Sequence, residues 1–125
     1  MRLFALVLVL AGCGERGTAV RVRADFDTAM SLQQLRFSGE RWFGPEVRPG
    51  AAEGVLQSGG ELLVWLPDDA SGDVRCVVEG LVGGKVVARG ETRVRLVPGR
   101  EVPAVVTLAC MAPGKGPGRL GRCDD

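Results

Sequence analysis

Alternating apolar and polar residues recur along the chain and predict β-strands. In segment 20–26 the residues at even positions are apolar and those between them are charged. The same period of two runs through 73–79, 92–96 and 102–108, whereas helical periodicity is almost absent. Because successive side chains of a strand point to opposite faces, each segment is expected to bury one face and expose the other.

Segment 61–66 has a different pattern, since it is apolar on both faces after Glu61. Such a segment is typical of a central strand that is covered on both sides. We therefore expect 61–66 to lie in the middle of a sheet, with Trp65 in the core.

Turn-forming residues separate the strand segments, at 58–60, 67–72, 82–85 and 98–100. Two consecutive glycines, Gly83 and Gly84, tolerate the positive φ angles of a tight hairpin turn. Segments 73–81 and 86–97 are therefore expected to pair as an antiparallel hairpin. Gly90, within the second arm, suggests a β-bulge.

The segment 27–34 is the hardest to interpret. We expect a loop that enters a strand near 32–38, and a short helix is the alternative because Ala29, Leu32 and Leu35 could share one helical face. Taken together, the strands and turns predict an all-β fold, an antiparallel β-sandwich of about seven strands over residues 19–110. Residues 111–125 are a Gly/Pro-rich tail.

Composition limits the chemistry that this chain can perform. It has 125 residues, room for one domain, with a net charge of +1 and neither His nor Tyr. No broad positive field exists to collect nucleic acid, and neither a Ser-His-Asp set nor a Cys-His pair is present. We expect a protein that is not an enzyme. A glycosidase that uses carboxylates alone is the alternative, but it needs two carboxyls across a cleft, for which a small sandwich has little room.

The first residues form a separate unit. Arg2 precedes an unbroken apolar run over 3–11, which is followed by Gly12 and Cys13. At about 1.5 Å per residue this run is too short to cross a hydrocarbon core of roughly 30 Å. We interpret it as a targeting segment. The alternative is that 3–11 is a buried strand or helix and Cys13 an ordinary buried thiol.

The sequence Leu10-Ala11-Gly12-Cys13 resembles the lipobox of bacterial lipoproteins. The resemblance implies that Cys13 is lipidated and that the chain is cut before it. Residues 1–12 would then be the signal peptide and 13–18 a lipidated spacer. It places the protein in the cell envelope, with the membrane as a partner through the lipid on Cys13. Gly14, in place of an Asp retention signal, favours the outer membrane.

The alternation and the order of turns over 18–110 resemble the immunoglobulin-like or transthyretin-like domains that occur singly on bacterial lipoproteins. The antibody spacing of Cys, Trp and Cys is absent, so the immunoglobulin-like resemblance concerns architecture.

Cys76, Cys110 and Cys123 remain if Cys13 is acylated, so one thiol is left over. A Cys110–Cys123 disulfide would close a Gly/Pro-rich loop and stabilise by about 3 kcal/mol. A Cys76–Cys110 bond between strands is the alternative. Thiol redox or metal chemistry would need paired spacings or His ligands that are missing.

Two further groups of charged residues could form a functional site or could be ordinary turn and surface residues. The carboxylates of Asp68, Asp69 and Asp73 could surround a calcium ion, but a turn explains them better, and we expect no metal and no cofactor. Four arginines alternate with other residues in two of the predicted strands: Arg21, Arg23, Arg93 and Arg95. They would form a basic stripe if these two strands are neighbours in one sheet. A solvated face is the preferred interpretation.

Trp42 and Phe43 are the adjacent aromatic pair of the sequence, and Arg41 precedes them. They could stack on a sugar or anchor a partner protein, or they could cover the open edge of the sandwich core. We expect a structural or protein-interaction module, with an envelope protein as a possible partner. The alternative is a carbohydrate- or small-ligand-binding lipoprotein that uses the Trp42-Phe43 loop.

Overall fold

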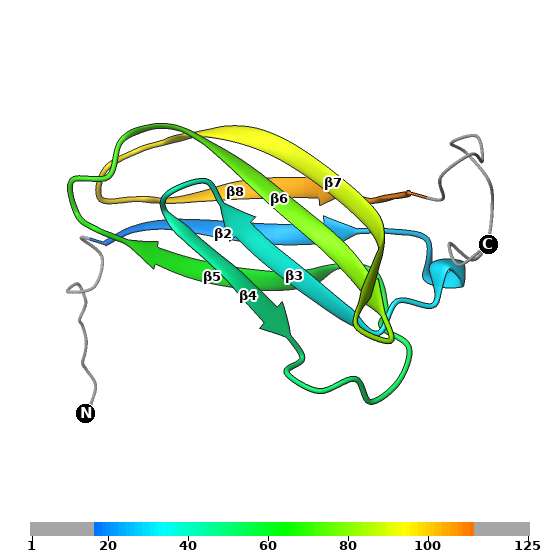
Figure 1. Cartoon of the computed structure of the whole chain (residues 1–125). Helices are drawn as coiled ribbons and strands as arrows, with labels where there is room; N and C mark the ends of the chain where they lie inside the picture. Colours follow the sequence, from blue (N-terminus) through cyan, green and yellow to red (C-terminus); the bar gives the residue numbers. More distant parts are fainter. Residues whose placement is uncertain (1–16, 112–125) are drawn as a thin grey trace, which may run out of the picture.

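The computed structural model describes residues 17–111, which form eight strands and one 3-10 helix (Figure 1). The residues that resemble a lipobox, Leu10-Ala11-Gly12-Cys13, and Cys123 lie outside this range. The elements, in chain order, are β2 (Thr18–Asp25), η2 (Thr28–Met30), β3 (Gln34–Gly39), β4 (Phe43–Arg48), β5 (Gly60–Leu66), β6 (Gly72–Val82), β7 (Lys85–Leu96), β8 (Glu101–Thr107) and β9 (Ala109–Cys110).

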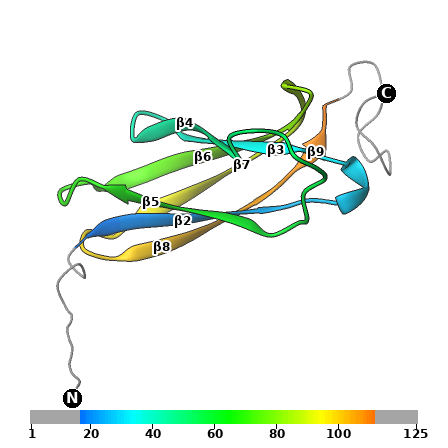
Figure 2. The same ribbon diagram turned by 90° about the horizontal axis from the view of Figure 1, so that it is seen from below.

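The strands form two sheets that face each other, and this confirms the predicted all-β sandwich. One sheet has the order β5-β2-β8 and the other the order β4-β3-β6-β7-β9, and Figure 2 shows them as two layers. The sequence indicated about seven strands. The structure has one more within the described range, because the chain adds the two-residue strand β9 after β8.

One pair of described strands departs from the predicted antiparallel arrangement. β2 and β8 run parallel, with Val20 beside Val102 and Val22 beside Ala104. No turn joins these two strands, which lie at opposite ends of the domain sequence. The alternation therefore fixed which of their faces is buried but left their relative direction open.

The core lies between the sheets, and most residues that the alternation assigned to the inner faces belong to it. Phe37 of β3 and Leu32 before it are the largest side chains that are almost fully buried. Five valines from the three strands β2, β6 and β8 are also almost fully buried: Val20, Val22, Val74, Val78 and Val106.

The hairpin β6–β7 is confirmed, with φ of 58° at Gly83 and 78° at Gly84. The predicted bulge at Gly90 is wrong, because the register shifts between Gly80 and Leu81, where β7 carries the extra residue Val87. Gly90 is needed for a different reason. A Cβ there would collide with the carbonyl oxygen of Thr107 in β8.

The segment 27–34 combines both expectations. The Asp27 carboxylate accepts a hydrogen bond from the Ala29 backbone N–H at 2.9 Å and caps the short helix η2. Ser31, with φ of 59°, ends the helix, and β3 begins at Gln34.

The prediction for segment 61–66 is wrong in its placement. β5 is the end strand of its sheet, paired with β2 alone among the described strands. Leu62 and Leu66 face the core, but Trp65 points outward and is 59% exposed. An apolar outer face therefore gave this edge strand the pattern of a central one.

Cys76 is buried and is a free thiol, so the alternative Cys76–Cys110 bond is wrong. In the ladder, Cys76 pairs with Thr92 of β7, while Cys110 pairs with Ala88. These partners are separated by about 13 Å along β7, at about 3.3 Å per residue. A disulfide requires Cα atoms within about 7 Å. The Cys110–Cys123 bond stays a prediction.

Within residues 17–111, no helix has the length and apolar character needed to span a membrane.

Candidate functional site

Trp42 and Phe43 lie where β3 turns into β4. Glu40 takes a left-handed conformation with φ of 42°, and the Trp42 backbone N–H donates to the Gly39 carbonyl oxygen at 2.7 Å. Both aromatic rings are partly buried against the core, in agreement with the interpretation that they cover its edge. They line two different hollows, however, so the structure separates the pair that the sequence joined.

Phe43 lines a hollow of about 200 Å³ between β4 and β5. Its ring lies over Gly39, where a Cβ would collide with it. The β4 part of the lining includes Glu46 and Arg48, and the β5 part runs from Leu62 to Trp65.

A second hollow of about 160 Å³ shares Arg48 and continues along the same side, over Leu35, Phe37 and Leu56. We call the two hollows together the edge groove.

The edge groove follows the open side of the sandwich. β4 and β5 each end a sheet, so one edge of each strand has no strand partner among the described residues. The opposite side is closed, because the chain passes from β8 directly into β9, which pairs with β7. The groove therefore has an apolar floor between two unpaired strand edges.

The charged residues at the rim of the edge groove already have partners. Arg48 binds Glu46 at 2.8 Å, and Glu61 binds Arg21 at 3.2 Å. The rim therefore presents paired charges of both signs. A segment that binds in the edge groove needs no net charge to match it.

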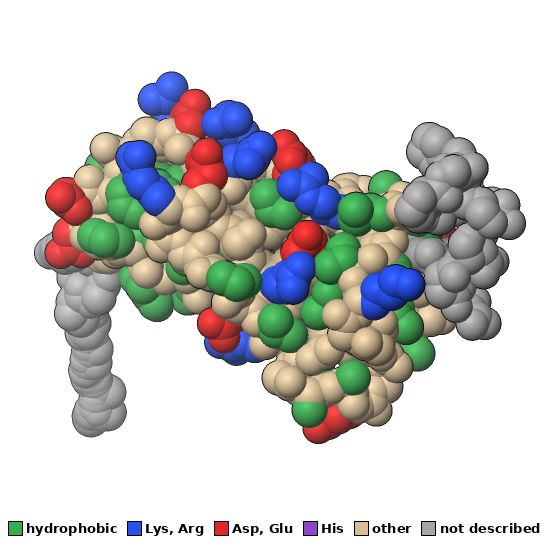
Figure 3. All heavy atoms as spheres, viewed as in Figure 1, with side chains coloured by type: hydrophobic (Ala, Val, Ile, Leu, Met, Phe, Trp, Pro, Cys, Tyr) green, Lys and Arg blue, Asp and Glu red, His purple; other side chains and the backbone are tan. Residues whose placement is uncertain are grey.

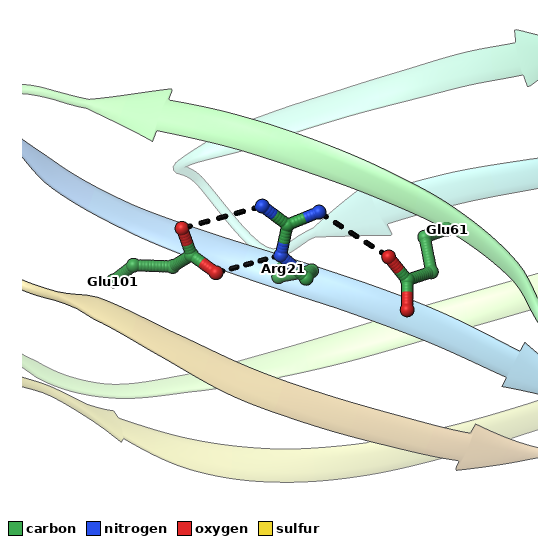
Figure 4. Close-up of polar contacts among 3 residues, drawn as sticks. All are labelled: Arg21, Glu61 and Glu101. Atoms are coloured by element: carbon green, nitrogen blue, oxygen red, sulfur yellow. Dashed lines mark hydrogen bonds and ion pairs between the residues drawn. The ribbon is translucent and has the colours of Figure 1, made fainter.

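Arg21 joins the three strands of the smaller sheet on its outer face (Figure 4). Its guanidinium binds Glu101 of β8 at 2.6 Å and Glu61 of β5 at 3.2 Å. The hydrogen bonds to Glu101 and then to Glu61 raise the pKa of Arg21, and the hydrogen bond from Arg21 lowers the pKa of Glu101. All three side chains are exposed, and each contributes a contact between strands.

A third hollow, of about 300 Å³, lies on the other side of the β3–β4 turn. We call it the arginine hollow, and its lining residues are Glu40, Arg41, Trp42, Asp73 and Arg93. The Arg41 guanidinium carbon lies 5.2 Å from the centroid of the Trp42 ring, within the range of a cation–π contact. The structure therefore keeps the predicted pair Arg41 and Trp42 together.

Sequence reasoning missed the other members of the arginine hollow. Asp73 and Arg93 come from the two arms of the β6–β7 hairpin, on its outer face. The alternation indicates that both side chains point outward. Their place beside the β3–β4 turn depends on the pairing of β3 with β6, which no local pattern indicates.

Two other candidates have a definite placement. Asp68 and Asp69 lie in the turn after β5, where the Ala70 backbone N–H donates to the Pro67 carbonyl oxygen at 2.9 Å. The described residues contain no group of three acidic, Cys or His side chains that could hold a metal ion.

The basic stripe does not form, because the arginines divide between the two sheets. Arg21 and Arg23 lie on β2 of the smaller sheet, and Arg93 and Arg95 lie on β7 of the larger one.

Comparison with protein families, with curated proteins and with solved structures found no match to this chain.

Proposed function

We propose that this protein is a lipid-anchored, non-enzymatic β-sandwich of the bacterial cell envelope, of the outer membrane in particular, that acts as a protein-interaction module. The lipobox at Leu10-Ala11-Gly12-Cys13 supports the anchor. Two or three acyl chains on one cysteine hold a protein stably in a bilayer, whereas one chain holds it weakly. β2 begins at Thr18, so a spacer of only a few residues would join the anchor to the domain.

The edge groove is the observation that carries the interaction part of the proposal. Two strand edges that lack strand partners within residues 17–111 flank an apolar floor, and such edges bind extended peptide segments by adding a strand. The paired charges at the rim favour an uncharged segment. The proposed partner is therefore an extended, mainly apolar stretch of another envelope protein.

The strand order also bears on the family resemblance. In an immunoglobulin sandwich the first two strands share a sheet, whereas here β2 and β3 lie in different sheets. Of the two resemblances, we propose the transthyretin-like one. The fold alone does not assign a function, because unrelated activities share the sandwich.

Site-specific photo-crosslinking in intact cells tests the groove. A photoreactive amino acid replaces Glu46, at the groove rim, and in a matched control it replaces Lys85, the exposed first residue of β7. We expect a discrete protein adduct from position 46 and little from position 85. Equal yields from both positions, or no adduct from position 46, would contradict the proposal.

The Cys13→Ser variant tests the anchor separately. It removes the sulfur that accepts the lipid, so the protein should leave the membrane fraction. The Cys76→Ser variant is the control, since Cys76 is buried in the core, and it should stay with the membranes. If the Cys13→Ser protein remains in the membrane fraction, the anchor is not at this residue.

We also propose that Cys110 and Cys123 form a disulfide, because the envelope is an oxidising compartment. Peptide mapping without reduction should recover the two cysteine-containing peptides as one linked species.

The arginine hollow supports a second candidate function, a small-ligand-binding lipoprotein that uses the Trp42 loop, for a carbohydrate or another small ligand. The hollow brings donor and acceptor side chains together beside an indole ring. Titration of tryptophan fluorescence with a panel of sugars tests the carbohydrate form of this idea, which predicts quenching by at least one sugar.

A further inference from the structure

Two arginines face each other across the β6–β7 ladder beside the arginine hollow. Arg75 pairs with Arg93, and directly opposed side chains on one face of a sheet have Cβ atoms about 4.5–5.5 Å apart. Like charges at this separation destabilise a sheet. The pair therefore places two positive charges side by side on the outer face of the hairpin.

The carboxylates near these arginines are already bound elsewhere. Glu40 accepts a hydrogen bond from the Arg75 backbone N–H at 2.7 Å, and Asp73 binds Arg95 at 3.7 Å. The remaining neighbour is Glu91, which binds Arg89 at 3.3 Å and reaches Arg75 only at 4.0 Å.

Arg93 and Arg41 have no ion pair with any residue between 17 and 111. Figure 3 shows the surroundings, in which Arg and Lys side chains alternate with acidic ones over β6 and β7.

Trp42 positions one of these two free cations. The Arg41 guanidinium lies over the indole, and Trp42 is partly buried in the core. A ring that is held by packing restricts the arginine stacked on it, so less side-chain freedom is lost when Arg41 binds a ligand. The same contact covers the indole, so a sugar could stack on this face only by displacing Arg41.

We propose that the arginine hollow binds a phosphate group, with Arg41 and Arg93 as its two ligands. Guanidinium groups match the geometry of phosphate oxygens and bind them with two parallel hydrogen bonds. The hollow, at about 300 Å³, has the volume of a small-molecule site and leaves room for the group that carries the phosphate. Glu40 and Asp73 accept hydrogen bonds from hydroxyls of that group.

The phosphate belongs to a small phosphate ester or to a lipid headgroup. The β3–β4 turn and the first residues of β6 lie at the end of the sandwich where β2 begins (Figure 1). If Cys13 is lipidated as proposed, this end lies near the headgroups. A small phosphate ester as the ligand depends only on the second candidate function, the small-ligand-binding lipoprotein. Neither ligand depends on the edge groove.

Tryptophan fluorescence of the whole mature chain, from Cys13 to Asp125, tests the phosphate site. Trp42 and Trp65 are its two tryptophans and Tyr is absent, so the Trp65→Phe variant carries Trp42 as its single reporter. Inorganic phosphate, glycerol phosphate and glucose are each titrated at constant ionic strength. We expect a saturable change with the two phosphates, weakened about tenfold or more by Arg93→Gln or Arg41→Gln. The matched control Arg89→Gln, on the same strand but outside the hollow, should bind like the parent.

Vesicles distinguish the two sources of phosphate. The protein is added to phosphatidylcholine vesicles with and without anionic phosphatidylglycerol. A Trp42 response only to vesicles that contain phosphatidylglycerol, lost in Arg93→Gln, supports the headgroup as the source. A response to soluble glycerol phosphate, lost in the same variant, supports the small molecule.

Three results would overturn the phosphate site: no Trp42 response to any phosphate source, an equal loss of the response in Arg89→Gln, or a response to glucose as strong as to phosphate. The soluble titrations need no lipid on Cys13, so a failure of the anchor proposal leaves this test intact.

Discussion

The backbone of Gly90 in β7 packs directly against the carbonyl oxygen of Thr107 at the end of β8, with no room for a side chain between them. This contact closes one side of the sandwich, just before the chain crosses from the smaller sheet into β9 of the larger one. The opposite side, between β4 and β5, stays open as the edge groove. The two sides of the sandwich therefore differ: β7 and β8 pack closely, whereas a hollow lies between β4 and β5.

Replacing Gly90 with alanine should destabilise the fold. The new methyl group meets backbone atoms, which cannot move aside without separating β7 from β8, and such overpacking costs roughly 1–3 kcal/mol. Urea denaturation followed by circular dichroism measures the loss. The control is Gly54→Ala, where a Cβ meets nothing within 4 Å, and it should change stability by less than about 0.5 kcal/mol. Equal effects of the two substitutions would contradict the packing described for Gly90.

The ion pair between Arg21 and Glu101 should make stability depend on pH. The pKa of Glu101 is lower in the folded protein than its ordinary value, because Arg21 donates a hydrogen bond to the carboxylate. The stabilising effect of the ion pair is fully present above the ordinary glutamate pKa of about 4.3. It is lost as the pH falls through the lower pKa that Glu101 has in the folded protein.

The Glu101→Gln variant should therefore unfold at lower urea than the parent at pH 7, and the gap should narrow below pH 4. Because the Arg21–Glu101 pair is exposed, the difference in urea midpoint between the parent and the variant is small. Glu53→Gln, which removes an exposed glutamate without an ion pair among the described residues, should show no such gap. A gap for Glu101→Gln that is constant from pH 7 to pH 3 would show that the pair does not act through charge.

The buried Cys76 thiol should react slowly in the folded protein. Burial, and then the negative charge of Glu40, raise its pKa to about 11. The reactive thiolate is therefore scarce at pH 8, and the core also excludes the reagent. Treatment with iodoacetamide and peptide mass spectrometry should find the Cys76 peptide unmodified in buffer and fully modified in urea. Rapid modification in buffer would show that β6 is not held in the core.

The two tryptophans should report opposite environments. The Trp42→Phe variant leaves Trp65, whose side chain is exposed, and we expect emission at long wavelength and strong quenching by iodide. The Trp65→Phe variant leaves Trp42, which is partly buried beneath Arg41, and we expect emission at shorter wavelength and weaker quenching. Similar iodide quenching of the two variants would contradict the outward orientation of Trp65 on β5.

Alternation predicted the faces of most strands correctly, because burial has the same period as the strand itself. Val20, Val22 and Ala24 are buried as expected. The method failed at β5, where Leu63 and Trp65 make an outer face apolar. Periodicity reports which side chains are apolar, and it does not distinguish a buried apolar face from an exposed one.

The β6–β7 hairpin shows how far a register can be read from the sequence. If Gly83 and Gly84 alone set the pairing, Val78 would oppose Arg89, although one is apolar and the other charged. A one-residue bulge is therefore required to restore Val74 opposite Val94. The residue pattern requires this bulge but does not locate it, and the presence of Gly90 pointed to the wrong place.

The candidate sites were only partly predictable. Arg41 and Trp42 were found because they are neighbours in the sequence. Their partners Asp73 and Arg93 lie far along the chain and reach the same hollow through the pairing of β3, β6 and β7. The edge groove depends on which strands end each sheet, and this is a property of the whole topology.

We propose that the protein is anchored through Cys13, and mass spectrometry of protein extracted from membranes tests this anchor most directly. Intact mass and peptide maps are recorded after alkylation of free thiols in urea, where the buried Cys76 is accessible. The account predicts that the chain begins at Cys13 with acyl groups attached, and that Cys76 is the alkylated cysteine. A chain that retains Met1, or a cytosolic protein without lipid, would contradict the anchor and with it the envelope location.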